Sequence, residues 1–298
     1  MKSAITDIVK RHWPLFLPYG ILRHVVKGKQ LARQSTLDPG FANYEKSLAR
    51  WQWLRELVLD ADEKRMAAWA TENYGCVIPF GPFQGMKYAA CRRQLSAAAR
   101  LGFYELELHP IIEEIVDRRY HRILNVGCSF GYYAVGLALR IQDCEVRAFD
   151  LQSRERELCR ALAQENGVAD RVIIGERFDP PMFADLADAR TLVVCDIEGG
   201  ELQLLDPLHS EKLALCDILV EMHDVYDRQI SAEVPRRFRD THEVKIIREG
   251  DHGPLKLPEK MHSMGSLERL VAVHGAARWG STPWAFMTSK QRKNSITQ

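Results

Sequence analysis

Two short segments place acidic side chains and a histidine directly after apolar runs. "VVCDIEGGE" carries Asp196 and Glu198, which alternate at the end of a predicted strand, so that one faces a crevice and the other faces away. "DILVEMHD" carries Glu221 and His223, two residues apart and on one face of the next strand. We interpret Glu198, and also Glu201 further along, as cap or surface charges.

His223 is the natural candidate for a general base, because imidazole titrates near neutrality and a neighbouring carboxylate can orient it. Asp196 and Glu221 are its expected partners. The same three side chains could hold a divalent cation such as Mg²⁺ or Mn²⁺, since oxygen donors and an imidazole suit these ions. Sequence spacing cannot verify three ligands from different strands, so the cation is kept as an alternative to the general base. A histidine that only hydrogen-bonds within the sheet is the other alternative.

A turn poor in side chains lies upstream, in "ILNVGCSFGYYAVGLA", residues 123–138. Gly127, Ser129 and Gly131 would let a ligand or a tightly packed helix approach the main chain. A dinucleotide fingerprint would need glycine at the positions of Ser129 and Tyr132, and the chain has no GKS or GKT phosphate loop. NAD, FAD and nucleoside triphosphates are therefore disfavoured.

An acidic residue follows this turn at the spacing of a ribose ligand. Asp150 ends the next predicted strand, "RAFD", about twenty residues beyond the turn, where a carboxylate can accept hydrogen bonds from both hydroxyls of a ribose. Turn and acid together predict a nucleoside site without a pyrophosphate.

The elements that must position these residues change character near residue 120. Residues 1–118 are expected to form a largely helical N-terminal cap and substrate region, and residues 119–298 a cofactor-binding domain. Strands separated by helix-length connections predict an α/β, Rossmann-like doubly wound sheet of seven mostly parallel strands, with its ligand crevice at their carboxyl ends. The expected strands are "RILNVG", "EVRAFD", "RVIIGE", "TLVVCDIE", "DILVEMHD", "HEVKIIRE" and "WAFMTSK".

Composition excludes several classes of partner. The 298 residues carry a formal charge of +1, which gives no global field for nucleic acid. The seven cysteines are scattered and form no CxxC, and no apolar run reaches membrane-span length, so we expect a cytoplasmic protein without structural zinc. Residues 1–50 are rich in Lys and Arg interleaved with apolar residues; we expect this segment to pack on its own domain rather than on an anionic membrane.

"NVGCSFG", "AFD" and the order of the strands over about residues 120–290 resemble the class I S-adenosylmethionine (SAM)-dependent methyltransferases. In that family the glycine-rich turn lies against the cofactor, and the acid binds its ribose. Asn125 stands where many members have an acidic residue. An aromatic ring and a carboxylate favour a sulfonium cation, so Tyr104 and Glu105 are further candidates. The cofactor contacts that we expect are Tyr104, Asn125, Gly127, Cys128, Ser129, Gly131, Tyr132, Asp150, Leu151 and Asp196.

A narrower resemblance suggests the acceptor. "VVCDIEGGELQLLDP" looks like the fourth-strand segment of the FkbM-type methyltransferases, which are commonly O-methyltransferases of sugars, glycans or other natural products. The expected function is therefore O-methylation of a small-molecule, sugar or natural-product acceptor. An N- or C-methyltransferase of the same fold and a non-catalytic nucleoside-binding module are the alternatives, and the sequence leaves the oligomeric state open.

Overall fold

The computed structural model describes residues 60–250, 255–274 and 282–291. The chain divides into two compact units, Met1–Asp62 and Glu63–Gln298, and the second holds the sheet and the helices that cover it. The basic segment considered above lies outside the described residues. Among the described helices, none has the length and apolar character needed to cross a membrane.

Seven strands form one sheet in the order β3-β2-β1-β4-β5-β7-β6. Strands β1 to β5 pair in parallel, whereas β7 is antiparallel to both β5 and β6. The predicted fold class, a mostly parallel doubly wound sheet with helices, is confirmed. The strands are β1 (Arg122–Val126), β2 (Glu145–Phe149), β3 (Val172–Gly175), β4 (Thr191–Cys195), β5 (Asp217–Glu221), β6 (His242–Ile247) and β7 (Trp284–Ser289).

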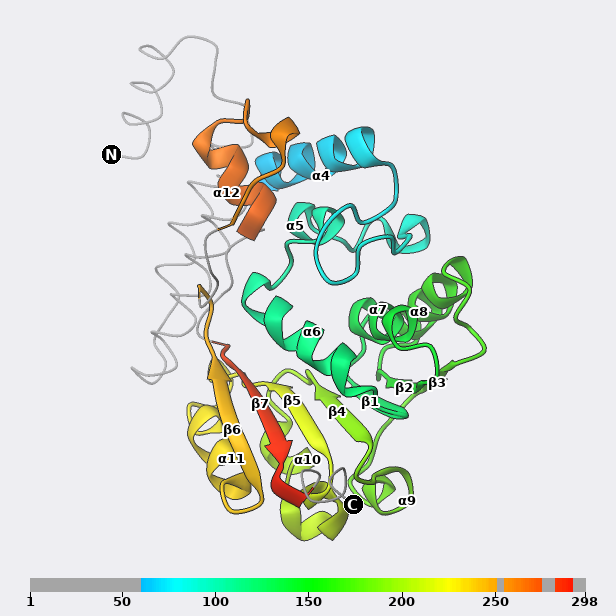
Figure 1. The fold of residues 1–298 in the computed structure, drawn as a ribbon, viewed down its shortest axis with the longest axis vertical. Helices are drawn as coiled ribbons and strands as arrows, with labels where there is room; N and C mark the ends of the chain where they lie inside the picture. The colour runs from blue at the N-terminus through cyan, green and yellow to red at the C-terminus, as the bar shows by residue number, and fades with distance from the viewer. Residues whose placement is uncertain (1–59, 251–254, 275–281, 292–298) are drawn as a thin grey trace, which may run out of the picture. The chain divides into compact units, whose positions relative to one another are not determined.

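The helices cover both faces of this sheet, as Figure 1 shows. One face lies under α6 (His109–Arg118), α7 (Tyr132–Arg140) and α8 (Ser153–Glu165). The other lies under α9 (Met182–Leu186), α10 (Glu201–Leu204) and α11 (Ile230–Phe238). The remaining helices are α4 (Asp60–Tyr74), α5 (Ala97–Leu101) and α12 (Ser266–His274), with short 3-10 turns at Ala89–Cys91, Leu106–Leu108, Pro207–His209, Glu211–Ala214 and Glu259–Met261.

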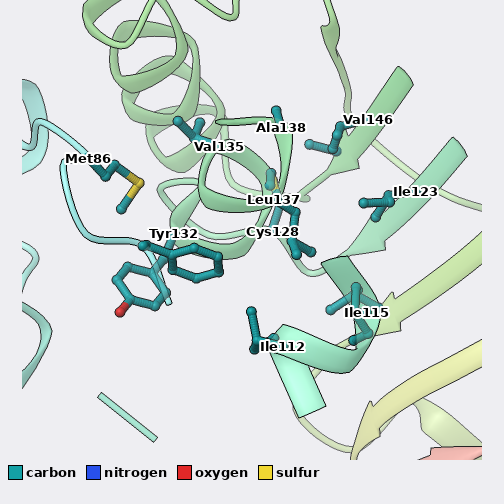
Figure 2. Close-up of a cluster of buried hydrophobic side chains, with 14 of the residues drawn as sticks. Met86, Ile112, Ile115, Ile123, Cys128, Tyr132, Val135, Leu137, Ala138 and Val146 are labelled. Atoms are coloured by element: carbon teal, nitrogen blue, oxygen red, sulfur yellow. The ribbon is translucent and has the colours of Figure 1, made fainter. Parts of the chain in front are cut away.

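The larger hydrophobic core joins the residues ahead of β1 to the sheet. Ile112 and Ile115 of α6 pack with Ile123 of β1, and Tyr132 and Val135 of α7 belong to the same cluster (Figure 2). Residues from the 78–115 region and from the sheet thus share one hydrophobic core, which helps to hold the start of β1 and the turn that follows it.

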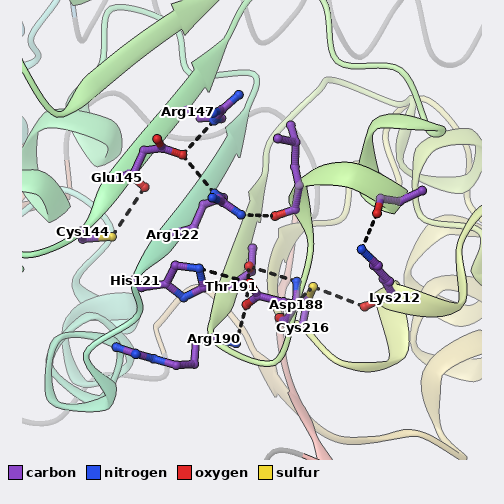
Figure 3. Close-up of polar contacts among 12 residues, drawn as sticks. His121, Arg122, Cys144, Glu145, Arg147, Asp188, Arg190, Thr191, Lys212 and Cys216 are labelled. Atoms are coloured by element: carbon purple, nitrogen blue, oxygen red, sulfur yellow. Dashed lines mark hydrogen bonds and ion pairs between the residues drawn. The ribbon is translucent and has the colours of Figure 1, made fainter.

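The amino-terminal ends of the central strands are held by charged pairs (Figure 3). Arg122 of β1 bonds to Glu145 of β2 at 3.0 Å and to the carbonyl oxygen of Leu186 at 2.9 Å. His121 lies 3.1 Å from Asp188, just before β4. The ion pair of Arg122 with Glu145 and the contact of His121 with Asp188 help to keep the register of β1 between β2 and β4. The polar groups available for chemistry therefore have to be sought at the carboxyl ends.

Candidate active site

Two glycines of the turn after β1 are needed because of their backbone conformation and the close approach of neighbouring residues. Gly127 has φ +78°, and a Cβ there would lie 1.6 Å from the carbonyl oxygen of Asp196. Gly131 has φ +98°, and its Cβ would lie 2.6 Å from Sγ of Cys159 on α8. The first glycine thus admits the loop after β4, and the second admits a neighbouring helix.

Three consecutive amide groups of this turn, at residues 127–129, donate hydrogen bonds within the chain. The N–H groups of Gly127 and Cys128 both donate to the carbonyl oxygen of Phe149 at 2.9 Å, and that of Ser129 donates to Oδ2 of Asp150 at 2.9 Å. A phosphate-binding turn needs such amides pointing at the ligand. The amides of Gly127, Cys128 and Ser129 are thus not available to a pyrophosphate, and the exclusion of dinucleotides stays a prediction.

Asp150 follows β2 and links that strand to the turn. Its Oδ1 accepts from the amide of Gln152 at 2.8 Å while Oδ2 holds Ser129, and the residue is half-buried. Each carboxylate oxygen has a second lone pair, so Asp150 can still accept hydrogen bonds from ribose hydroxyls. Leu151 beside it is 69% exposed and offers an apolar surface next to that carboxylate.

The other predicted cofactor residues lie around the same turn. The ring of Tyr104 packs against Tyr132, with centroids 5.3 Å apart, and Glu105 accepts a hydrogen bond from the Tyr133 hydroxyl. Glu105 is buried and has φ +49°, a strained conformation for a residue with a side chain. The Cys128 thiol is buried toward the core, and its contact with Cys159 together with burial raises its pKa.

Asn125 is a buried polar residue in the middle of the sheet. Its side-chain nitrogen lies 3.5 Å from the carbonyl oxygen of Val194, but its buried Oδ1 has no hydrogen-bond partner among the described residues. Such a group normally finds a partner in the functional state. The expected contact of Asn125 with a ligand amine stays a prediction.

Four carboxylates surround the ring of His223, which is 4% exposed. Nδ1 lies 2.6 Å from Oε1 of Glu201. Nε2 lies 3.6 Å from Oδ1 of Asp196. It also lies 3.7 Å from Oε2 of Glu221 and from Oε2 of Glu198. The side of the ring that carries Nδ1 is thus hydrogen-bonded. The side that carries Nε2 makes no hydrogen bond to the three carboxylates that face it, and we call it the open side.

Two expectations about these acids are wrong. Strand β4 ends at Cys195 rather than continuing to residue 198, and Glu198 takes φ +55° and Gly199 φ +102° as the chain turns. Asp196 and Glu198 therefore both approach His223 instead of pointing to opposite sides. Glu201 is fully buried rather than a surface charge, because the loop after β5 places the imidazole against it.

A second side chain that sequence reasoning missed is Tyr226. Its ring centroid lies 6.0 Å from that of His223, and the residue is 55% exposed. A Cβ on Gly199 would lie 3.0 Å from the Cβ of Tyr226, so the glycine allows the aromatic residue to sit beside the acids. No spacing in the sequence indicates this contact, whereas the final Glu of "DIEGGE" could have drawn attention to Glu201.

The charges around His223 set its protonation. Burial by itself would lower the pKa of His223, but the hydrogen bond with Glu201 and the negative charges of Glu221, Glu201 and Glu198 outweigh it. The pKa is therefore raised above the ordinary value for histidine. An imidazolium formed here is stabilised by its surroundings, as a proton-accepting group requires.

The open side also has the composition of a cation site. One ligand atom each from Asp196, Glu221 and His223 lies within 4.8 Å of the others. Two carboxylates and an imidazole are suitable donors for Mg²⁺ or Mn²⁺. The predicted catalytic residues are thus brought together in an arrangement that suits either a proton or a divalent cation.

A series of contacts joins the turn after β1 to Asp150 and to the acids around His223. Ser129 bonds to Asp150 on one side of the turn, and Gly127 lies against Asp196 on the other, with His223 next in line.

No family model and no curated protein matches this chain. Comparison with solved structures finds an O-methyltransferase from Bacillus cereus in complex with SAH (S-adenosylhomocysteine), with 12% identity, a TM-score of 0.40 and coverage of 83% of this chain and 100% of that one. It also finds TomG, an O-methyltransferase from Streptomyces achromogenes involved in tomaymycin synthesis, in complex with SAM, with 16% identity, a TM-score of 0.39 and coverage of 80% and 97%. A third match, WbdD, has 16% identity and a TM-score of 0.41; 60% of this chain matches 39% of WbdD.

The contact between Gly127 and the Asp196 loop leads to a stability prediction. Gly127→Ala should lower the free energy of unfolding by roughly 3–5 kcal/mol, because it combines a left-handed backbone with a clash against a carbonyl group. Gly167→Ala is the matched control: its φ is +70°, but nothing lies within 4 Å of its Cβ, so only the backbone cost of about 1–2 kcal/mol remains. Urea unfolding measures both, and equal losses would contradict the proposed close approach.

Proposed function

We propose that this protein is a SAM-dependent methyltransferase that methylates a hydroxyl group of a small molecule, sugar or natural product. The observation that carries the proposal is this series of contacts, which places a buried histidine with acidic partners next to a nucleoside-type turn. The doubly wound sheet of seven mostly parallel strands is the fold that the resemblance to the class I methyltransferases implies. The FkbM-like character of "DIEGGELQLLDP" supports an oxygen acceptor.

The residues around the turn suit this cofactor. Asp150 has lone pairs for the ribose, Leu151 offers an apolar surface for the base, and the buried Oδ1 of Asn125 can accept from the methionine amine. When bound, SAM supplies a methyl group on a positively charged sulfur. The acids near His223 and the aromatic ring of Tyr104 favour such a cation.

The contribution of the chain to the reaction is to align the acceptor and take its proton. Nε2 of His223 would take the proton of the acceptor hydroxyl as its oxygen receives the methyl group that the cofactor would supply. Glu201, Glu221 and Asp196 stabilise the resulting imidazolium. General-base assistance of this kind contributes typically 10²- to 10⁴-fold in rate.

A divalent cation is the second candidate for the role of the open side. The specific observation is the group of ligand atoms from Asp196, Glu221 and His223. A cation there would lower the pKa of an acceptor hydroxyl and reduce the need for a base. The alternative functions are methylation of a nitrogen or carbon acceptor and binding of a nucleoside without catalysis. Release of SAH in the presence of an acceptor distinguishes an enzyme from a binding protein.

Binding of SAH tests the assignment of Asp150. Asp150→Ala should weaken SAH by roughly 1.5–3 kcal/mol, the scale of hydrogen bonds to a charged group. Because Asp150 also holds the turn, a 2′,3′-dideoxy analogue of SAH serves as control: it should lose little or no affinity on the same substitution. Calorimetry with both ligands decides, and an equal loss for both would remove Asp150 from the ribose and leave it a structural role.

Turnover separates the two candidate mechanisms. His223→Ala should lower turnover with a panel of hydroxylated acceptors about a hundredfold or more while leaving SAH affinity nearly unchanged. If His223 acts as a base, wild-type activity should survive EDTA, and Mn²⁺ should show no stoichiometric binding by calorimetry. Loss of activity in EDTA, restored by Mn²⁺ or Mg²⁺, would favour the cation, and full activity of both His223→Ala and EDTA-treated enzyme would contradict both roles.

A further inference from the structure

We propose that Glu201 is a positioning residue, which holds the neutral His223 ring with its proton on Nδ1 and the lone pair of Nε2 directed at Asp196 and Glu221. The inference deepens the proposed function and rests on it for its catalytic meaning. The geometry of the pair can nevertheless be tested without any acceptor.

The bonded side of the ring is defined by a single carboxylate oxygen. Oε1 of Glu201 lies 2.6 Å from Nδ1 of His223 and also accepts from the amide of Gly199 at 3.1 Å. Glu201 is 0% exposed, and its Oε2 has no hydrogen-bond partner among the described residues. The carboxylate is therefore held by the backbone on one side and directed at the ring on the other.

The two nitrogens of the ring have unequal environments, and this selects the tautomer. An ionised carboxylate only accepts hydrogen bonds, so a short contact with it requires a proton on Nδ1. The carboxylate oxygens near Nε2 are 3.6–3.7 Å away, beyond hydrogen-bonding distance. The acids that face Nε2 also attract a proton, but only Nδ1 has a carboxylate oxygen at hydrogen-bonding distance, so in the neutral ring the proton stays on Nδ1 and Nε2 keeps its lone pair.

This arrangement serves either candidate mechanism. A general base needs an unprotonated nitrogen facing the acceptor, and a cation ligand needs the same lone pair, with the other nitrogen bonded to a carboxylate. Burying a carboxylate away from water costs free energy unless it is hydrogen-bonded. A position that served only for packing would be filled more favourably by an apolar side chain. Glu201 is thus explained by the orientation of His223 rather than by packing.

Nitrogen-15 NMR of histidine-labelled protein reads the tautomer directly. In a series of increasing pH, continued until the imidazole signals stop changing and the ring is neutral, wild-type His223 should show a protonated Nδ1 and an unprotonated Nε2. A His223→Gln variant assigns the signal among the ten histidines. A wild-type ring protonated on Nε2 would overturn the inference, whether or not SAH binds.

Substitutions then distinguish positioning from packing. Glu201→Leu fills similar volume but removes the acceptor, so the Nε2–H tautomer should appear and turnover should fall about a hundredfold or more, with SAH affinity unchanged. Glu201→Gln keeps an acceptor oxygen without the charge; the Nδ1–H tautomer should persist, with a smaller loss of about tenfold. A Glu201→Leu protein with wild-type tautomer and turnover would contradict the role.

Glu198→Gln is the matched control. It removes one negative charge near the same ring from a side chain that is 67% exposed and not bonded to Nδ1. Its tautomer should be that of the wild type, and a change as large as that of Glu201→Leu would mean that charge alone sets the ring. Failure of all variants and wild type to bind SAH would count against the proposed cofactor, independently of the tautomer.

Discussion

The site depends on one close approach, in which the carbonyl oxygen of Asp196 occupies the space that a side chain at position 127 would fill. The amide of Asp196 also donates to the carbonyl oxygen of Val126 at 2.9 Å, so β1 and the loop after β4 are joined on both sides of this contact. The turn that bears the expected cofactor contacts and the loop that bears the acids are therefore fixed relative to each other. Any larger residue at position 127 would separate them.

Charged side chains are arranged differently at the amino-terminal and carboxyl-terminal ends of the central strands. At the amino-terminal edge, acids and bases are paired, as in Arg122 with Glu145, and the result is structural. At the carboxyl edge, the charged contacts of His223 within the described chain are all with carboxylates. Such an excess of negative charge is costly unless a proton or another cation shares it. A raised histidine pKa, a sulfonium cofactor and a divalent cation are three ways of meeting that one requirement.

The sequence predicted the elements well and the side-chain environments less well. The seven strands were found because β-branched runs of four to six residues alternate with helical segments, and the structure places each within a few residues of its expected span. Strand β4 was predicted too long because Asp196, Ile197 and Glu198 continue its alternation, whereas the strand ends at Cys195 and the chain turns through a left-handed backbone at Glu198 and Gly199. Glu201 was misjudged because its burial depends on His223, which lies on a different strand connection and is distant in the sequence.

The central claim is that the turn and Asp150 bind a nucleoside that carries no phosphate. Calorimetric titration of the full chain with SAH and, separately, with ATP tests it most directly. Because the amides of Gly127, Cys128 and Ser129 are bonded within the chain, SAH should bind with one site per chain and ATP should produce no saturable heat. Absence of SAH binding, or ATP binding as tight as that of SAH, would contradict the account.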